Sequence, residues 1–314
     1  MLVTCVPLFV GRLKTVMREI ACPICNDSER TVVFAATLPA DFDEAAPPSP
    51  YSAHYRINKC ASCGLIYSSP IMNDAGVAEL YEHSSETNVE VGEEDNVRRT
   101  MALYYGLAKP HLSARDRMLD IGCDMGFLLE AARDDGFAEL YGIEPNPIAR
   151  SVASRIEGSM IIDGFYERTD YPVDHFDLIT MIHVLDHLVD PRITLSHAIK
   201  HLRPRGILVA VVHNVDSLLG RLLGDRFPVF NLYHHYFFSK ATLAQLFRRR
   251  GFEVIDVVKT RNCYSLGFFT KRLPGLPEAI RRGAFGALEA TGLATFPVTI
   301  PVGNIGIVAR RPID

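Results

Sequence analysis

The sequence predicts an α/β protein with one large seven-stranded sheet, helices on both faces of that sheet, and a small cysteine-rich module in front of it. Three observations carry this prediction. From residue 117 onward, short apolar segments alternate with segments of helical periodicity, as in parallel βαβ units. Residues 118–126 (MLDIGCDMG) join an apolar strand to a helix through an acidic glycine turn, which in open α/β sheets lies beside a ligand. Upstream of this turn, four of the seven cysteines form two Cys-x-x-Cys pairs.

The composition of the 314-residue chain shows no bias towards a charged partner. Hydrophobic residues make up 48% and charged residues 22%, which is ordinary for a globular domain, and the formal net charge is -4 at pH 7. This balance gives no net attraction to nucleic acid or to an anionic membrane. No segment is long and apolar enough to span a bilayer, and the apolar residues 1–10 are too short. We therefore expect a cytoplasmic protein in which residues 1–20 form an N-terminal extension.

The cysteine pairs predict a zinc-binding module over residues 21–70. In a reducing compartment, paired cysteines at this spacing point to a metal rather than to disulfides. Two pairs complete a tetrahedral shell of four thiolates, which leaves no open position and therefore makes the zinc ion structural. Gly64 follows the second pair, where a tight turn favours a residue without a side chain. Four unrelated thiols or a redox pair are the alternatives, and the two matched pairs favour zinc. The expected ligands are Cys22, Cys25, Cys60 and Cys63.

Residues 71–112 are predicted to form a helical linker or lid. After a short strand over 65–70, Asp74 is expected to cap a helix that ends near residue 81, and an acidic loop follows over 84–95. Residues 96–112 carry apolar side chains at helical spacing. This second helix would lead the chain into the main domain, and in many α/β enzymes such a segment covers the ligand cleft.

The main domain is predicted over residues 113–314. The helix predicted at 239–250 begins at Ser239 and ends with three arginines before Gly251, which is the expected order of cap and charge, and a further helix is predicted from Glu278 to about Thr291. An insertion at about 263–303 would add a wall to the acceptor site or be a surface excursion. Strands are predicted at 117–121, 139–143, 160–162, 176–182, 206–212, 252–259 and 304–310. Helices are predicted near 127–135, 147–156, 191–202 and 239–250.

Three acidic features follow one another as a nucleoside site in an α/β sheet requires. Asp120 opens the turn after the first strand, and Glu144 ends the second strand, where a carboxylate can accept hydrogen bonds from both ribose hydroxyls. Asp163 and Gly164 end the third strand, next to the expected purine. A dinucleotide site is the competing interpretation, but residues 127–130 (FLLE) lack the further glycine that a pyrophosphate cradle needs.

On these residues the chain resembles class I S-adenosylmethionine-dependent methyltransferases. Within that superfamily it is similar to bacterial enzymes with an N-terminal four-cysteine zinc module, many of which act in sugar, surface-polysaccharide or natural-product biosynthesis. The resemblance covers about residues 20–260 and implies a Rossmann-like methyltransferase sheet. Besides the cysteine pairs and the glycine turn, it rests on the segments YSSP (67–70), HVLDHLVDP (183–191), LRPRG (202–206) and HHYFFS (234–239).

The resemblance implies how the glycine turn would hold S-adenosylmethionine. Gly122 and Gly126 would lie against the methionine part of this cofactor, and Asp120 would help to hold its amino group. The family usually has a glycine where this chain has Asp124. This acid should narrow the pocket, although it can also pair with the positive charge of the cofactor.

The resemblance also assigns the other half of the cofactor site. Glu144 would bind the ribose, and Asp163 with Gly164 would border the adenine. His183, at the end of the fourth strand, would lie beside the sulfonium.

A histidine-rich loop before the helix predicted at 239–250 supplies the candidate catalytic residues. Histidine has an ordinary pKa suited to a general base near neutral pH, and similar family members place a histidine here near the acceptor. His234 is the expected base, with His235 second and Tyr236 beside them. Alternatively, the paired histidines only anchor the loop.

Three further features of this region bear on catalysis. Sugar C-methylating relatives pair the loop histidine with a glutamate, but no acid occurs between Arg226 and Ser239. His187 is expected to shape the entry of a helix. His213 is expected to be a surface residue.

The expected reaction is methyl transfer to a small-molecule acceptor, at a hydroxyl or a carbon of a sugar, a surface-polysaccharide precursor or a natural product. One alternative is an RNA methyltransferase whose zinc module binds RNA. The acids of that module and the absence of an Asn-Pro-Pro-Tyr type motif speak against it, so nucleic acid is not an expected partner. The other alternative is a non-catalytic relative in which the turn around Asp124 binds no cofactor.

Overall fold

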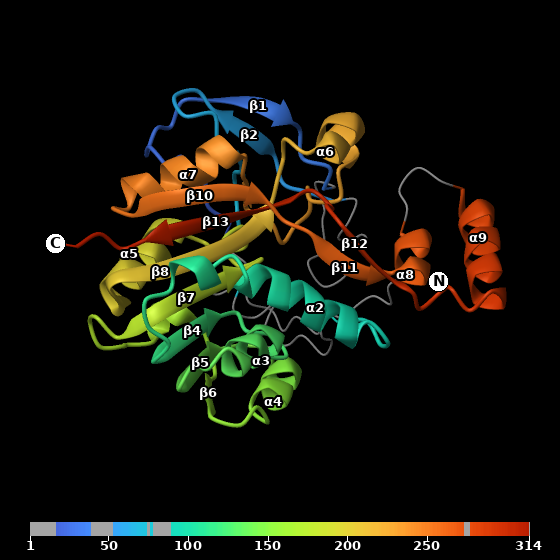
Figure 1. Ribbon diagram of the computed structural model, residues 1–314. Coiled ribbons are helices and arrows are strands. Elements are labelled where there is room, and N and C mark those ends of the chain that lie inside the picture. The colour runs from blue at the N-terminus through green and yellow to red at the C-terminus, as the bar shows by residue number, and fades with distance from the viewer. Residues whose placement is uncertain (1–16, 39–52, 74–75, 78–88, 273–276, 314) are drawn as a thin grey trace.

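The computed structural model describes residues 17–38, 53–73, 76–77, 89–272 and 277–313, and its main feature is the predicted seven-stranded sheet (Figure 1). The strand order is β10-β13-β8-β7-β4-β5-β6. Strands β4 to β8 pair in parallel, whereas β13 runs antiparallel to both β8 and β10. The bounds are β4 Arg117–Ile121, β5 Glu139–Ile143, β6 Ser159–Ile162, β7 Phe176–Ile182, β8 Leu202–His213, β10 Glu253–Lys259 and β13 Asn304–Arg310.

Helices cover both faces of this sheet, as predicted. The helices are α2 Glu94–Tyr105, α3 Phe127–Asp134, α4 Pro147–Ala153, α5 Pro191–His201 and α7 Lys240–Arg249. Alternate residues of β8 show why both faces are covered. Leu208, Ala210 and Val212 pack into one core cluster with α5 and α7, whereas Val209 and Val211 pack into another with α2 and α3.

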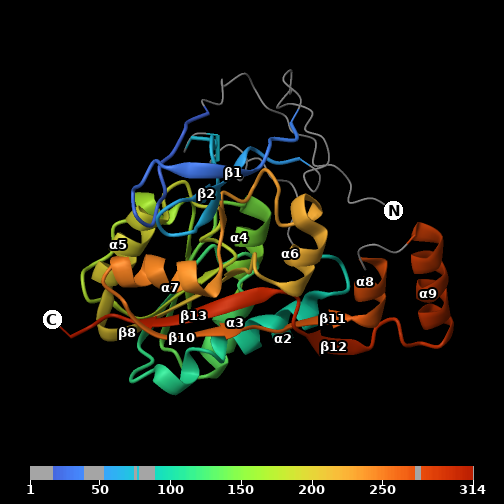
Figure 2. The same ribbon diagram turned by 90° about the horizontal axis from the view of Figure 1, so that it is seen from above.

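A second, four-stranded antiparallel sheet carries the cysteine pairs and lies beside the main sheet (Figure 2). It contains β1 Arg30–Phe34, β2 Ile57–Cys60, β3 Ile66–Ser68 and β9 Tyr236–Phe237. Strand β9 belongs to the segment between β8 and α7, far along the chain from the others. The cysteine-rich segment is therefore joined to the main domain by backbone pairing.

The expected insertion between β10 and β13 forms a hairpin with two helices and extends to one side of the main sheet (Figures 1 and 2). Its elements are β11 Asn262–Ser265, α8 Leu266–Lys271, α9 Glu278–Ala290 and β12 Pro297–Ile300, and a further helix, α6 Leu218–Leu223, follows β8. The backbone N–H of Cys263 in β11 donates to Thr100 Oγ1 of α2 at 2.8 Å. The insertion is thus tied to α2.

Helix α2 is shorter than its apolar spacing predicts. It ends at Tyr105, and a single 3-10 turn, η1 Lys109–His111, follows it because Pro110 has no N–H for an α-helical bond. The predicted helix that begins at Asp74 lies mostly outside the described residues.

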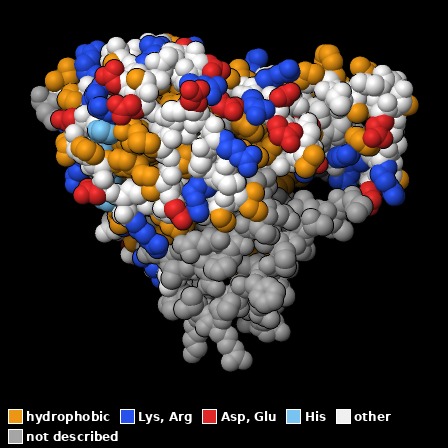
Figure 3. All heavy atoms as spheres, turned by 90° about the horizontal axis from the view of Figure 1, so that it is seen from below, with side chains coloured by type: hydrophobic (Ala, Val, Ile, Leu, Met, Phe, Trp, Pro, Cys, Tyr) orange, Lys and Arg blue, Asp and Glu red, His pale blue; other side chains and the backbone are white. Residues whose placement is uncertain are grey.

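The surface and the helix lengths add two observations. Over the described part of the face in Figure 3, basic and acidic side chains are interspersed and form no large patch of one sign. Among the described residues, every helix is too short or too polar to cross a bilayer.

Candidate functional site

The turn between β4 and α3 has three residues in the left-handed region. Gly122, Asp124 and Gly126 have φ angles of 70°, 48° and 81°. A Cβ atom on Gly122 would come within 2.5 Å of Val184 Cγ2, and one on Gly126 within 2.4 Å of Ile156 Cδ1. Both glycines are therefore required by packing as well as by backbone geometry. Asp124 occupies a position where glycine would be unstrained.

Three carboxyl groups gather around this turn. Asp120 is only 2% exposed and accepts a hydrogen bond from Thr180 Oγ1 at 2.6 Å. Glu144 accepts from the backbone N–H groups of Asp124, at 2.9 Å, and Asn146, at 2.8 Å. Burial raises the pKa of Asp120 to about 7, of Glu144 to about 7 and of Asp124 to about 6, and repulsion between the carboxylates adds to the first two. A cationic ligand that donates hydrogen bonds would relieve this repulsion, so these residues fit S-adenosylmethionine.

The acid after the third strand lies at the rim of this region. Asp163 is exposed and pairs with Arg150 Nη1 at 2.7 Å. The same guanidinium nitrogen donates to the backbone carbonyl of Glu144 at 3.0 Å, which links the ends of β5 and β6. Gly164 has a φ of 117°, which favours glycine.

His183 ends β7 in a strained conformation with a φ of 54°. Its Nε2 lies 3.4 Å from Asn304 Nδ2 of β13, and its ring centroid lies 6.3 Å from that of Tyr104 in α2. Burial lowers the pKa of His183 to about 3, so its ring is neutral at neutral pH. Helix α2 therefore packs against the end of β7.

The loop before α7 holds His234 in one tautomer. Its Nδ1 lies 2.7 Å from the backbone oxygen of Val229 and 3.1 Å from Asn231 Nδ2. Because the nearer atom only accepts, we assign the proton to Nδ1 and the lone pair to Nε2. Burial lowers the pKa of His234. The next two residues are pinned to the segment after β7: His235 Nδ1 donates to Leu188 O at 3.0 Å, and the Tyr236 hydroxyl donates to Val189 O at 2.7 Å.

Beside His234 lies a cluster around Asp186 that the sequence did not reveal, and its other members are His183, His187 and His213. Asp186, 1% exposed, accepts a hydrogen bond from His213 Nδ1 at 2.9 Å. The His213 ring centroid lies 4.7 Å from that of His183 and 4.8 Å from that of His234, and the rings of His187 and His234 are 4.4 Å apart.

Two expectations from the sequence change here. His213 is half-buried and paired rather than a surface residue. The loop itself contains no acid, but Asp186 of the turn after β7 has a ligand atom within 4.8 Å of one on His234, and its backbone carbonyl accepts from the N–H of His235 at 2.8 Å. A signal was present, because His183 and His213 each stand at the carboxyl end of one of two neighbouring strands.

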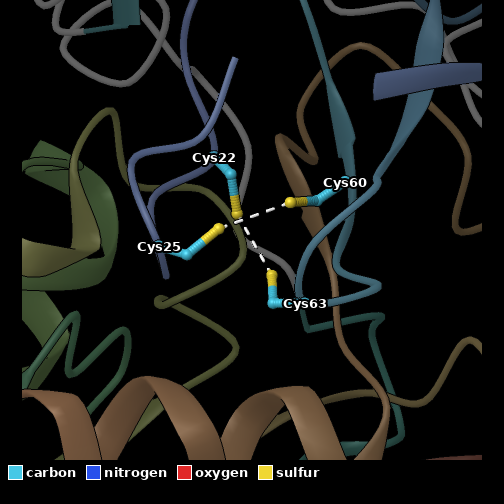
Figure 4. Close-up of side chains that lie close together, drawn as sticks. All are labelled: Cys22, Cys25, Cys60 and Cys63. Atoms are coloured by element: carbon cyan, nitrogen blue, oxygen red, sulfur yellow. Dashed lines mark hydrogen bonds between the residues drawn. The ribbon is translucent and has the colours of Figure 1, made fainter. Parts of the chain in front are cut away.

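The four paired cysteines converge, as Figure 4 shows. The Sγ atoms of Cys22 and Cys63 are 3.3 Å apart, those of Cys25 and Cys60 are 3.4 Å apart, and all four lie within 4.8 Å of one another. A disulfide would need about 2.05 Å, whereas zinc bonds of about 2.3 Å in a tetrahedron place sulfurs about 3.8 Å apart. The cluster therefore fits a metal ion.

The two cysteine turns have the same backbone. The N–H of Asn26 donates to Cys22 O at 2.8 Å, and the N–H of Gly64 donates to Cys60 O at 3.1 Å. Gly64 has a φ of 76°, as its place after the second pair predicts, and Asn26 takes the matching position with a φ of 62°.

Comparison with known proteins gives one family match and several relatives. A family model described as a methyltransferase domain matches residues 94–257, slightly more than half of the chain. The tRNA U34 carboxymethyltransferase of Aliarcobacter butzleri is 27% identical over 165 residues, which are 50% of this chain and 54% of that protein. The ubiquinone biosynthesis O-methyltransferase of Aromatoleum aromaticum is 28% identical over 172 residues, which are 49% of this chain and 73% of that protein. The chain spans about half the length of the tRNA-modifying relatives that it matches.

Among solved structures, the similarity concerns the fold alone. A chain of the complex between the Haloferax volcanii Trm112 methyltransferase activator and the putative methyltransferase has a TM-score of 0.51 with this chain at 16% identity. The match covers 71% of this chain and 95% of that chain.

Proposed function

Because this chain belongs to the methyltransferase domain family, we propose that it transfers a methyl group from S-adenosylmethionine to a small-molecule acceptor. The acceptor atom is a hydroxyl oxygen, or a carbon, of a sugar, a surface-polysaccharide precursor or a natural product. The observation that carries this proposal is the buried imidazole of His234, whose tautomer leaves Nε2 able to accept a proton at the carboxyl end of the sheet.

The chain's residues would divide the cofactor between them. Asp120 and Asp124 supply negative charge near the cationic methionine end, and Glu144 has carboxylate lone pairs for the ribose hydroxyls. The turn at Gly122 and Gly126 would lie against the methionine part, and His183 would lie near the sulfonium. At the other end of the cofactor, Asp163 and Gly164 would border the adenine. When bound, S-adenosylmethionine supplies the electrophilic methyl group.

The protein must also remove the proton of the acceptor. His234 takes it at Nε2, and the Val229 carbonyl stabilises the Nδ1–H that this role requires. His235 and Tyr236 hold the loop through their bonds to Leu188 and Val189, so we assign them an anchoring role beside the base.

Helix α2 is proposed to cover this site. The Arg98 guanidinium lies over the Phe127 ring, 4.4 Å from its centroid, and pairs with Glu130 at 2.9 Å. Both partners are in the first turn of α3, directly after the glycine turn. Displacement of α2 would therefore open the turn to solvent.

The test separates cofactor binding from chemistry. Glu144→Ala should abolish S-adenosylmethionine binding in calorimetry, because it removes the carboxylate assigned to the ribose. His234→Gln should bind the cofactor like the wild type and lower turnover by a factor of about 100 or more, since general bases contribute roughly that much. Normal turnover in His234→Gln would remove this residue from the base role, and no cofactor binding by the wild type would leave the non-catalytic interpretation.

We further propose that Cys22, Cys25, Cys60 and Cys63 hold a structural zinc ion. The converging Sγ atoms support this, and four thiolates leave no open coordination position for a substrate.

A second candidate function, RNA methylation, is favoured by one observation. A cavity of about 500 Å³ lies beside the first cysteine turn. Its lining includes the basic side chains Arg192, Lys200, Arg249 and Arg250, together with Asp190, which pairs with Arg192 at 2.7 Å. An RNA substrate would bind with an affinity that falls steeply with salt concentration, which an electrophoretic shift series measures. Absence of a shift at low salt would exclude this candidate.

A further inference from the structure

The cluster around Asp186 contains two buried polar atoms that lack a partner. Asp186 Oδ1 and His183 Nδ1 are shielded from solvent and have no hydrogen-bond partner among the residues that the structure describes. A buried carboxylate oxygen without a donor is costly, and in native proteins such atoms usually face a water molecule or an ion. Both residues belong to one group with His213, in which one ligand atom of each residue lies within 4.8 Å of the others.

The scaffold that carries these residues is rigid. His183 and His213 stand at the carboxyl ends of β7 and β8, which are paired neighbours in the sheet, and the His183 N–H donates to Val211 O at 2.8 Å. Asp186 is held through its main chain, since its carbonyl accepts from His235 N at 2.8 Å. Side chains placed by strand ends and by such bonds keep the precise geometry that a metal ion requires.

The donor set and its spacing suit a transition metal. Two imidazoles and one carboxylate are a common facial set for divalent first-row ions, and they leave positions open for water or another oxygen ligand. Two ligands about 2.1 Å from an ion and at right angles are about 3.0 Å apart, and His213 Nδ1 lies 2.9 Å from Asp186 Oδ2. Without the ion these two atoms share a proton, which binding of the ion would release. The amide of Asn304, 3.4 Å from His183 Nε2, is placed to hold the other nitrogen of that ring.

We propose that His183, Asp186 and His213 bind a divalent first-row transition metal ion. This site is separate from the four-cysteine cluster and differs from it in chemistry, because it offers nitrogen and oxygen ligands and keeps open positions. It leaves Nε2 of His234 as the adjacent proton acceptor. The metal site does not depend on the proposed reaction, since binding is measured without an acceptor.

The same carboxylate has a competing set of neighbours. Asp186 with His187 and His234 also brings three ligand atoms within 4.8 Å of one another. In that set His234 could coordinate only through Nε2, because its Nδ1 is engaged by Val229, and Nε2 is the atom proposed to take the proton of the acceptor. The first set also holds both partnerless atoms, so it is the one we assign.

The test is a titration with Co²⁺. The protein is full-length and tag-free, and it is purified with the metal of the cysteine cluster still bound. Calorimetry and visible spectroscopy should show about one Co²⁺ bound per chain, with d–d bands but without the near-ultraviolet absorption that thiolate ligands produce. His213→Gln and the isosteric Asp186→Asn should each weaken this binding by at least about tenfold, as loss of a ligand does. His187→Gln is the matched control and should leave the Co²⁺ affinity within about threefold.

Folding is monitored in the same samples. The metal content of the cysteine cluster and the thermal melt show whether each variant is intact, and His213, which is half-buried, is the milder of the two substitutions. The proposal is overturned by the absence of Co²⁺ binding outside the thiolates, or by unchanged affinity in folded His213→Gln and Asp186→Asn. It is also overturned if His187→Gln abolishes binding while His213→Gln preserves it.

Discussion

At the scale of single residues, Asp124 is the most unusual position of the cofactor turn. Its φ of 48° lies in the left-handed region, which explains why a glycine is usual there in the family that the chain resembles. Its carboxylate also stands close to those of Asp120 and Glu144, whose pKa values it helps to raise. Backbone strain and charge repulsion therefore coincide at one residue.

Asp124→Asn should stabilise the cofactor-free protein, because asparagine tolerates the same backbone conformation and carries no charge. The folded pKa of about 6 is above the ordinary 3.8, so the stability linked to this group is complete below pH 3.8 and is lost as the pH rises through 6. We expect a gain of roughly 1–3 kcal/mol at pH 8 and a smaller gain at pH 5, measured by urea unfolding.

The control for this experiment is Asp134→Asn, an exposed position on α3, which should change stability by less than about 0.5 kcal/mol. Equal stability of Asp124→Asn and wild type at pH 8 would show that Asp124 is not destabilising.

At the scale of elements, the junction of β4 and α3 depends on close packing. Gly126 precedes α3 as its N-cap with a φ of 81°, and its missing side chain leaves room for Ala153, the last residue of α4, and for Ile156 beyond it. A positive φ and a close neighbour therefore coincide at Gly126, where the turn before α3 meets the end of α4.

Gly126→Ala should destabilise the protein by roughly 2–4 kcal/mol, because it adds backbone strain and a clash with Ile156. Gly136→Ala is a matched control: Gly136 has a φ of 94°, but nothing lies within 4 Å of an added Cβ. That control should cost only about 1 kcal/mol. Chemical denaturation measures both, and equal losses would mean that packing at Gly126 does not matter.

The β3–β9 pair is the second element that positions the site. Tyr67 pairs with Tyr236, and Ser68 N donates to His235 O at 2.8 Å. The strand that follows the second cysteine pair therefore holds the loop of His234 through main-chain bonds.

At the scale of the whole molecule, this pairing couples the cysteine cluster to the histidine loop. If the cysteines hold zinc as proposed, Cys60→Ser should remove about one ion per chain and destabilise the fold, because metal binding and folding are linked. It should also increase amide hydrogen exchange at Tyr236 and Phe237, whose strand loses its support. Metal analysis and exchange mass spectrometry measure these effects.

Cys263→Ser serves as the control for this variant, since Cys263 is buried outside the cluster. It should retain the metal and the protection of β9. Unchanged exchange at β9 in a zinc-free Cys60→Ser protein would show that the two regions are independent.

Much of the architecture follows from local sequence patterns. The strand and helix segments of the main sheet can be predicted to within a few residues, because apolar periodicity and caps are properties of neighbouring residues. The cysteine cluster follows from spacing, and the Gly64 turn from the conformation that such a turn demands.

The cluster around Asp186, by contrast, depends on the tertiary structure. His183 and Asp186 lie in the turn after β7, His213 ends β8, and His234 lies in the loop before α7. No spacing rule relates these three segments. They meet because β7 and β8 are neighbours in the sheet and because β9 joins the second sheet, which brings the loop of His234 against the turn after β7. Local sequence determined which residues end the strands, whereas strand order, a property of the whole fold, determined which of those residues touch.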